Sequence, residues 1–296
     1  MTLEQLRVFV AVAERGHLTK AAEVLSLTPS AVSASIRVLE ERYGTPLFDR
    51  IGRGIVLSDA GRSFLPEATA TLASARATEA TLSDLGSGQR GTLRVQASQT
   101  IASYWLPPFL VRFHERFPRV ELCLTVGNTQ SVARAVVDGT AEIGFVEDQV
   151  DEAALSSTVV SEDRFAVVVA PDHPWADGRP LTVAALRGGR WIMREHGSGT
   201  RSAFEVMLGE LGIDGASLDV ALTLPSNEAM RAAVAAGPYV TVISTLVVAA
   251  DLKAGLLRAV NLRLPPRSFY RIRHGSRYRS RASLALEELV GNAGSA

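Results

Sequence analysis

The chain has 296 residues and a mass of 31.6 kDa, which exceeds one average domain of ~100–150 residues and predicts two or three domains. Hydrophobic residues make up 47% and charged residues 21% of the sequence, which excludes a mainly disordered chain. Lys+Arg and Asp+Glu both number 31, so a polycation that coats nucleic acid is excluded and any DNA contact must be local. Because Cys123 is the single cysteine, the chain cannot form an internal disulfide or a thiolate zinc cluster.

The N-terminal segment reads as an amphipathic helix and not as a signal peptide. Residues 1–16 carry charges at Glu4, Arg7 and Glu14 and lack a continuous apolar run. The later apolar stretches, 165–170 and 240–250, are shorter than the ~20 residues of a membrane-spanning helix or are broken by polar residues. We therefore expect a cytoplasmic protein with no membrane partner.

Residues 2–46 predict three short helices. Thr19 is placed to cap the second helix, and the third starts at Pro29 and ends at Gly44. A small residue, Ala22, stands where two steeply crossing helices of a helix-turn-helix need close approach. The order of elements is typical of a DNA-binding unit.

The exposed start of the third helix carries polar side chains. Hydroxyl groups and a guanidinium beside a helix N-terminus can reach phosphates and base edges in a major groove, and those on this face belong to Ser30, Ser33 and Arg37, next to Ala34. Residues 46–58 alternate weakly and can form a two-stranded wing that carries Arg50 and Arg53. The alternative is a helical bundle with a solvated polar face, since residues 1–62 are nearly balanced in charge.

Residues 58–85 predict one long helix. Six of its residues recur at steps of three and four, as in a heptad seam, and all but Glu79 are apolar: Leu65, Ala68, Leu72, Ala75, Glu79 and Leu82. At ~1.5 Å per residue such a helix spans about 40 Å, and its thin, Ala-rich stripe favours pairing with a second copy of the chain. The alternative is a helix that lies on its own domain. Residues 85–91 predict a flexible break.

From Thr92 onward, strand-like segments alternate with helical patterns, so we expect an α/β class with parallel sheets. About two hundred residues with this alternation indicate two lobes. The predicted strands are 92–98, 120–126, 141–146, 165–170, 191–194, 218–224 and 240–244.

Residues 9–61, from FVAVAERG to LSDAG, resemble the N-terminal winged helix-turn-helix of LysR-type transcriptional regulators over the whole segment. The pieces YWLPPFLVRFHERFP, NTQSVARAVVDGTAEIGFVE, MREHGSGTR, SNEAMRAAVAAG and LKAGLL look like the effector-binding domain of the same family. The GSGTR and SNEAM pieces look most like the subgroups that regulate sulfur-assimilation or carbon-fixation operons.

This resemblance implies a repressor or activator, usually a homotetramer, that binds an interrupted inverted repeat in double-stranded DNA and responds to a small co-inducer. It implies a winged helix-turn-helix over residues 1–58, a linker helix and hinge over 59–91, and a periplasmic-binding-protein-like effector domain over 92–296. Within that domain, lobe I would comprise 92–161 and 266–296, and lobe II 162–265.

The resemblance also implies which residues meet DNA, among them Pro29, Ser30, Ser33 and Arg53. Ala34 departs from the family pattern, in which many members carry Arg or Gln, so base recognition must depend on Ser33, Ser35 or Arg37. The predicted DNA-binding set is Thr28, Pro29, Ser30, Ser33, Ala34, Arg37, Arg50 and Arg53.

Small polar residues follow several predicted strands, where parallel α/β lobes bind ligands at helix N-termini. Each junction alone is more typical of a helix N-cap, but their convergence would form one cleft. The predicted effector-binding set is Ser98, Gln99, Thr100, Asn128, Thr129, Glu147, Arg194, Ser198, Gly199, Thr200, Ser226 and Asn227.

Arg194 and Arg201 add positive charge near the cleft, which favours a small anionic metabolite: an oxyanion of sulfur, or a phosphorylated or carboxylated compound. Glu147 and Glu195 argue against a purely cationic pocket. The GSGT segment lacks the spacing of a phosphate-binding P-loop. Tyr239 is either a wall of the pocket or part of a surface turn.

The sequence offers little for catalysis. No GxSxG, HExxH or CxxC motif occurs, and the five histidines are scattered, so we expect no enzyme, metal or cofactor. The alternatives are a solute-binding protein or a small-molecule enzyme built on the same lobes. Residues 267–281 are rich in arginine and can be a nucleic-acid patch, although their alternation favours a strand and a solvated turn.

Overall fold

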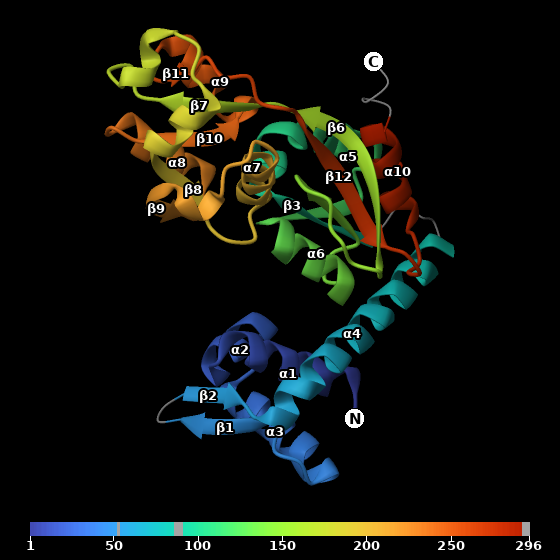
Figure 1. Cartoon of the computed structure of the whole chain (residues 1–296). Coiled ribbons are helices and arrows are strands. Elements are labelled where there is room, and N and C mark those ends of the chain that lie inside the picture. Colours follow the sequence, from blue (N-terminus) through green and yellow to red (C-terminus); the bar gives the residue numbers. More distant parts are fainter. Residues whose placement is uncertain (52–53, 86–90, 292–296) are drawn as a thin grey trace. The chain divides into compact units, whose positions relative to one another are not determined.

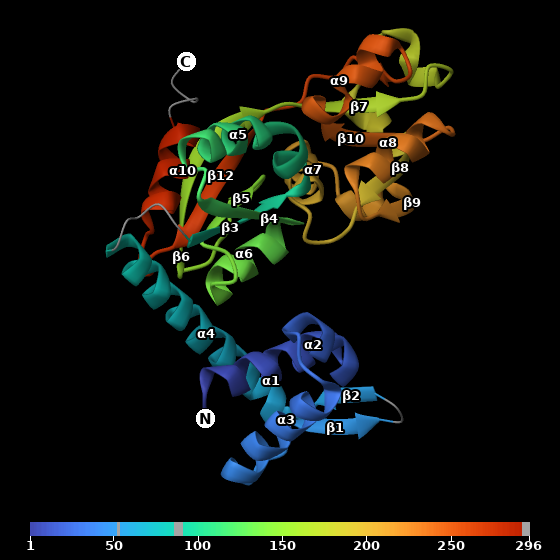
Figure 2. The same ribbon diagram turned by 180° about the vertical axis from the view of Figure 1, so that it is seen from behind.

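The computed structural model describes residues 1–51, 54–85 and 91–291. The chain divides into two compact units, Met1–Leu82 and Ser83–Ala296, and each is considered by itself. Figures 1 and 2 show the elements of both units from opposite sides.

Three short helices form the N-terminal unit together with a hairpin and the start of a long helix. The elements are α1 (Leu3–Arg15), α2 (Leu18–Leu25), α3 (Pro29–Tyr43), β1 (Phe48–Ile51), β2 (Gly54–Leu57) and α4 (Asp59–Leu85). The predicted cap of α2 at Thr19 is wrong: His17 is extended, and its Nδ1 accepts a hydrogen bond from the Thr19 amide. An imidazole nitrogen therefore satisfies the orphan amide, and the helix begins at Leu18, two residues earlier than a hydroxyl cap at Thr19 would allow.

The turn between α2 and α3 is short and sharply bent. Ser26 adopts a left-handed conformation, with φ of 54°, and its amide bonds back to the carbonyl of Ala22. Ala21 and Ala22 are fully buried, which lets α2 lie close to its neighbours. Sequence and structure therefore agree on a helix-turn-helix with a small residue at the crossing.

The long helix α4 uses the first half of its apolar stripe inside its own unit. Ala68 and Leu72 are buried in the core that surrounds Phe9, whereas Glu79 and Leu82 are exposed. The expectation of one continuous seam for a partner helix is thus wrong for this half. Its spacing serves the core of the same chain, which needs the same three- and four-residue steps.

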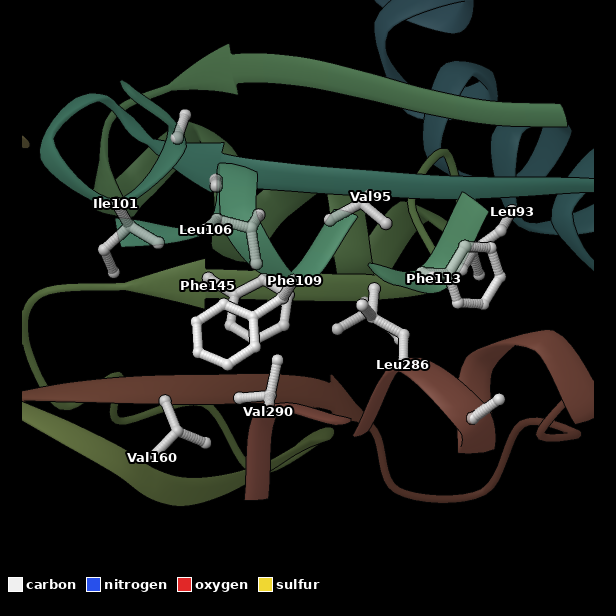
Figure 3. Packing of buried hydrophobic residues seen from close by; sticks show 14 of the residues in the cluster. Leu93, Val95, Ile101, Leu106, Phe109, Phe113, Phe145, Val160, Leu286 and Val290 are labelled. Carbon is white, nitrogen blue, oxygen red and sulfur yellow. The ribbon is translucent and has the colours of Figure 1, made fainter. Parts of the chain in front are cut away.

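Lobe I is a five-stranded sheet in the order β4-β3-β5-β12-β6. Helices α5 and α10 cover one face, where Phe109 and Leu286 pack with Val95 and Phe145 (Figure 3); α6 covers the other face. Its elements are β3 (Gly91–Ser98), the π-helical turn η1 (Ile101–Trp105), α5 (Pro107–Arg116), β4 (Val120–Gly127), α6 (Thr129–Asp138), β5 (Ile143–Val146), β6 (Leu155–Asp163), β12 (Arg267–His274) and α10 (Arg281–Gly291).

Lobe II is a second five-stranded sheet, in the order β11-β7-β10-β8-β9. Helix α7 packs on one face through Phe204, and α8 and α9 pack on the other through Met230 and Val247. Its elements are β7 (Phe165–Val169), the 3-10 turns η2 (Pro174–Asp177), η3 (Val183–Gly188) and η4 (Gly215–Ser217), β8 (Arg190–Arg194), α7 (Gly199–Glu210), β9 (Asp219–Leu224), α8 (Asn227–Ala235), β10 (Val240–Ser244), α9 (Thr245–Ala254) and β11 (Arg258–Ala259).

Both sheets are mixed, so the expectation of wholly parallel sheets is wrong. Strand β12 is antiparallel to β5 and β6, and β7 is antiparallel to β10. Arg164 alone separates β6 from β7, so the chain passes from one sheet to the other without the crossover helix that a parallel connection requires. Strand β12 returns the chain to lobe I beside β6.

The arginine-rich segment 267–281 is structural. Arg271 of β12 and Arg279 both pair with the buried Glu287 of α10, at 2.5 and 2.7 Å. Arg277 donates to the carbonyls of Val136 and Val137 at the end of α6, at 2.6 Å each. The expected strand is confirmed, but these arginines serve packing within lobe I rather than a solvated turn.

Tyr239 does not line the cleft. It is half-buried against the core of lobe II, and the guanidinium of Arg190 lies 5.3 Å from its ring centroid. Arg190 begins β8, whereas Arg194 ends it, so Tyr239 lies at the opposite end of the strand from the predicted pocket. None of the helices among the described residues is long and apolar enough to cross a membrane.

Candidate functional site

The start of α3 presents an exposed polar face in the N-terminal unit. The hydroxyl of Thr28 accepts a hydrogen bond from the Ala31 amide at 3.2 Å and lies 3.0 Å from the hydroxyl of Ser30. Thr28 therefore caps the helix, and Pro29 follows at its first position. The exposed residues of the predicted DNA-binding set on this face are Thr28, Pro29, Ser30, Ala34 and Arg37, with Ser33 half-buried.

The side chains at this face suit contact with a polyanion. Arg37 is exposed and lies 3.8 Å from Glu41, a separation typical of a weak surface ion pair. The positive end of α3 lies next to Ser30, where phosphate oxygens can be bound. Arg50 is exposed on β1 opposite Ile55 of β2. Arg53 lies outside the described residues.

Hydrogen bonds between the two lobes bring several predicted effector residues together. The Asn227 amide donates to Gln99 Oε1 at 2.7 Å, and Asn227 Nδ2 donates to Thr100 Oγ1 at 3.0 Å. Gln99 and Thr100 follow β3 of lobe I, whereas Asn227 begins α8 of lobe II. Arg194 Nη1 donates to Asn227 Oδ1 at 3.0 Å and so extends the contact within lobe II.

Glu195 closes this network on its other side. Arg194 binds its carboxylate in bidentate fashion, at 2.8 and 2.9 Å, and Asn128 Nδ2 of lobe I donates to it at 3.2 Å. Burial opposes ionisation of Glu195, but the hydrogen bonds and charge of Arg194 outweigh it, so the pKa of Glu195 is lowered. We call the connected residues the interlobe latch: Gln99, Thr100, Asn128, Arg194, Glu195 and Asn227.

A further contact between lobes extends the latch. Glu228, at the start of α8, accepts from Gln99 Nε2 at 3.0 Å and from the Tyr104 hydroxyl at 3.2 Å. Burial, together with the charge of Glu228, raises the pKa of Tyr104. The phenol therefore remains protonated and able to donate.

A second buried cluster joins the lobes where the chain crosses between them. Arg267 Nε donates to Asp163 Oδ2 at 2.8 Å, and the Ser244 hydroxyl donates to Asp163 Oδ1 at 2.7 Å. Arg267 Nη1 donates to Thr200 Oγ1 of α7 at 3.2 Å. The guanidinium also lies 4.3 Å from the ring centroid of Phe165. We call Asp163, Thr200, Ser244 and Arg267 the hinge cluster.

Gly199 is the point of closest approach at the start of α7. A Cβ added there would lie 2.6 Å from Thr129 Oγ1 and 3.0 Å from Glu147 Oε2, both in lobe I. Only a glycine permits this approach. The N-cap residue of the helix, Ser198, makes no side-chain capping bond and is buried, so the positive end of α7 is directed at the same place.

Four buried polar atoms of residues at or near the contact between the lobes have no hydrogen-bond partner among the described residues: Ser98 Oγ, Thr129 Oγ1, Glu147 Oε1 and Arg267 Nη2. Such atoms are rare in native proteins and cost free energy unless a ligand or water satisfies them. Their residues come from both lobes and include the hinge cluster. Their unmet hydrogen bonds are the feature of this region that a ligand or water would satisfy.

The predicted cleft region is less cationic than the presence of Arg194 and Arg201 in the sequence leads us to expect. Arg194 is neutralised by Glu195, Arg201 by Glu205 at 2.7 Å, and Arg267 by Asp163. Ser226 serves as the N-cap of α8, its Oγ accepting from the Ala229 amide. Within the described residues, the structure contains no cluster of three or more His, Cys, Asp or Glu side chains that can hold a metal ion.

Sequence reasoning missed the buried residues Asp163, Ser244 and Arg267. Arg267 and Asp163 are 104 positions apart, and Arg267 lies in a segment whose arginines suggested a solvated surface. The sequence offered one signal. Arg267 is a charged residue at the start of a strand whose other buried residues are Phe269 and Ile272. This signal becomes informative only when the pairing of β12 with β6 is known.

A helix-turn-helix unit followed by a two-lobed α/β unit is the architecture of a DNA-binding regulator with an effector-binding domain, and the chain belongs to the LysR family of bacterial transcriptional regulators. Residues 3–62 match the family model described as "Bacterial regulatory helix-turn-helix protein, lysR family", and residues 86–294 match "LysR substrate binding domain". The chain is accordingly a regulator and not an enzyme.

Individual relatives show which members of the family the chain resembles. It is 36% identical to the Escherichia coli K12 regulator YeiE over 285 residues, covering 95% of this chain and 94% of YeiE. It is 31% identical to the RuBisCO operon transcriptional regulator of Allochromatium vinosum, covering 98% and 95%. The CcmR regulatory domain of Synechocystis PCC6803, solved in complex with 2-PG, superposes with a TM-score of 0.63 at 24% identity and covers 69% of this chain and 98% of that domain. The resemblance to regulators of carbon-fixation operons is thus confirmed.

Proposed function

We propose that the chain binds an interrupted inverted-repeat operator through the exposed face of α3 and responds to a small anionic metabolite held between lobes I and II. The four unpartnered polar atoms of Ser98, Thr129, Glu147 and Arg267 carry the second half of this proposal. The structure of CcmR with 2-PG supports it, since that related fold was solved with this ligand.

The donors at the cleft fit the anionic part of a ligand. Ser98 and Thr129 contribute hydroxyl groups, the start of α7 contributes amides, and Arg267 Nη2 contributes a guanidinium N–H. Hydrogen bonds from charged donors to anionic oxygens are the stronger kind. The effector-binding residues are therefore Ser98, Thr129, Glu147 and the start of α7 from the predicted set, together with Arg267.

Ligand binding and DNA binding are coupled through the lobes and the oligomer. Two copies pair through the second half of α4, where Glu79 and Leu82 are exposed, and two such pairs form a tetramer, which places DNA-binding units on separate half-sites. A ligand that bonds to both lobes stabilises one arrangement of the lobes over the other. This change alters the separation of the paired units and so the contact with the operator. The expected compartment is the cytoplasm.

The DNA half of the proposal is tested by footprinting the full chain on the DNA upstream of its own gene. Wild type is expected to protect two half-sites, with an affinity that falls steeply as salt is raised. Arg37→Ala should weaken specific binding by about 10-fold or more, because one base or phosphate contact contributes ~1–3 kcal/mol.

Arg7→Ala is the matched control for this test, because Arg7 is an exposed arginine on α1 that pairs with Glu4 at 3.6 Å. Equal footprints for Arg37→Ala and Arg7→Ala would remove Arg37 from the interface. Protection of random DNA as strong as that of the promoter would contradict operator binding as a whole.

A further inference from the structure

We propose that the cleft selects ligands with a hydroxyl group or a protonated oxyanion, and that Glu147 and Arg267 read this group together. This inference rests on the proposed effector site. It concerns which anions the site accepts, whereas the proposed function requires only that an anion binds.

Glu147 and Arg267 each bring a buried polar atom without a hydrogen bond to the same small region, an acceptor oxygen from Glu147 and a donor nitrogen from Arg267. Glu147 follows β5, is 3% exposed, and its Oε1 has no hydrogen-bond partner among the described residues. Arg267 begins β12 and is 8% exposed. Its Nη2 lies 2.7 Å from Asp163 Oδ2 but makes no hydrogen bond of acceptable geometry among the described residues. Glu147 Oε1 and Arg267 Nη2 are 3.9 Å apart, which is beyond hydrogen-bond distance.

The remaining bonds of the hinge cluster cannot relieve Glu147. Asp163 Oδ2 lies 2.7 Å from Arg267 Nη2 and accepts from Nε, so the charge of the guanidinium is already balanced by Asp163. The other oxygen of Asp163 accepts from Ser244. Glu147 is therefore the excess carboxylate of this region. A buried carboxylate oxygen without a donor is costly.

A hydroxyl is the group that satisfies both atoms at once. Its oxygen accepts from Arg267 Nη2 and its proton is donated to Glu147 Oε1, because hydroxyls are both donors and acceptors. A bare oxyanion oxygen can accept from Arg267, but it meets Glu147 as a second negative charge. An ammonium group can donate to Glu147 but is repelled by Arg267. The pair thus discriminates among ligands by the presence of an O–H group.

The rest of the ligand lies toward the donors of the cleft. Thr129 Oγ1 and Glu147 Oε2 both contact the position of a Cβ on Gly199, so the unpaired hydroxyl of Thr129 and the positive end of α7 lie beside Glu147. These groups donate to the anionic part of the ligand while Glu147 accepts from its hydroxyl. The class of ligand that fits is a hydroxy acid, or a phosphate that retains a proton at neutral pH.

Two pairs of anions that differ mainly in the O–H group provide the test, by calorimetric titration of the full chain at pH 7.5. Inorganic phosphate keeps at least one proton at this pH and sulfate keeps none, whereas glycolate carries a hydroxyl that acetate lacks. Wild type is expected to bind phosphate and glycolate at least 10-fold more tightly than sulfate and acetate.

Glu147→Gln removes the negative charge and supplies an amide N–H, so its preference should disappear and its affinity for sulfate should rise. Glu115→Gln, an exposed carboxylate on α5, is the matched control and should keep the wild-type preference. Comparison of the four anions on wild type needs no variant, so the test holds even if Glu147→Gln is unstable.

The possible failures can be told apart. If none of the four anions binds, the proposed anionic effector is wrong, and this inference fails with it. If the anions bind without preference, or if Glu147→Gln keeps the wild-type preference, the anionic effector stands and the role of Glu147 and Arg267 is contradicted.

Discussion

Gly199, the first residue of α7, lies too close to Thr129 and Glu147 of lobe I to carry a side chain unless its neighbours move. An added Cβ meets Thr129 Oγ1 at 2.6 Å, closer than Cβ atoms approach other atoms in proteins, and Glu147 Oε2 at 3.0 Å. Gly199→Ala must therefore displace the side chains of Thr129 and Glu147 or push α7 away from lobe I. We expect at least a 10-fold loss of affinity for phosphate, measured by titration calorimetry, because ligand donors would shift by a large part of an ångström.

Gly209→Ala is the control in the same helix, since a Cβ at Gly209 meets nothing within 4 Å. It should leave affinity unchanged and stabilise the unit by up to ~1 kcal/mol, because alanine has the higher helix propensity. Unchanged phosphate affinity in Gly199→Ala would show that the start of α7 does not contribute to the site.

At the residue scale, the sequence predicted groups that act near their own position in the chain. Thr100, Asn227 and Gly199 stand at strand-to-helix junctions, where local patterns reveal both the helix start and the polar group. Arg267 acts on Asp163, 104 positions earlier, and this proximity arises from strand pairing alone. Periodicity carries no information on such a pair.

At the scale of elements, α4 shows how one spacing serves two purposes. Leu72 is 7% exposed and belongs to the core of the N-terminal unit, whereas Leu82 is 65% exposed. A stripe that packs on its own core and a stripe that pairs with another helix both need apolar residues at three- and four-residue steps. The extent of the helix could therefore be predicted from the sequence, but the partner of each half could not.

The two halves of α4 should respond differently to substitution. Leu82→Glu should shift the full chain toward monomer in sedimentation velocity, with no loss of helix content by circular dichroism, because it places charge in the proposed seam. Leu72→Ala should destabilise the N-terminal unit by ~2–5 kcal/mol through the cavity it leaves, seen as faster amide exchange in α1 and α4.

Each variant is the control for the other in this experiment. A Leu82→Glu protein that sediments like wild type would contradict pairing through the second half of α4. Leu72→Ala with unchanged exchange would contradict its place in the core.

For the whole molecule, 31 basic residues balance 31 acidic residues. The same balance holds near the predicted cleft, because Arg194, Arg201 and Arg267 each form an ion pair with a carboxylate of the same chain. The α/β class and the seven expected strands could be predicted from hydrophobic alternation. The antiparallel placement of β12 could not, because a strand has the same pattern in either direction. The antiparallel pairing of β12 with β6 also places Arg267 opposite Asp163, which creates the hinge cluster between the lobes.

The interlobe latch makes the stability of the Ser83–Ala296 unit depend on pH. Glu195 binds Arg194 of lobe II and accepts from Asn128 of lobe I, and its pKa is lowered from the ordinary value of 4.5 because Arg194 outweighs the effect of burial. For a carboxyl with a lowered pKa, stabilisation is present above the unfolded-state pKa and is lost as pH falls through the folded-state value. Wild type should therefore exceed Glu195→Gln in urea resistance by a constant amount between pH 7 and pH 5.5, and the difference should vanish well below pH 4.5.

Tryptophan fluorescence can follow this unfolding in the intact chain, because all three tryptophans lie in the Ser83–Ala296 unit. Glu288→Gln is the control: Glu288 of α10 pairs with Arg116 of α5 at 3.6 Å, and both side chains are more than half exposed, at 60% and 55%. Solvent screening keeps the contribution of such an exposed pair small, so Glu288→Gln should follow the wild-type curve at every pH. If the difference between wild type and Glu195→Gln stayed the same from pH 7 to pH 3.5, the ionised carboxylate would not be what holds Arg194 and Asn128 together, and closure of the lobes would have to depend on Asn227 with Gln99 and Thr100.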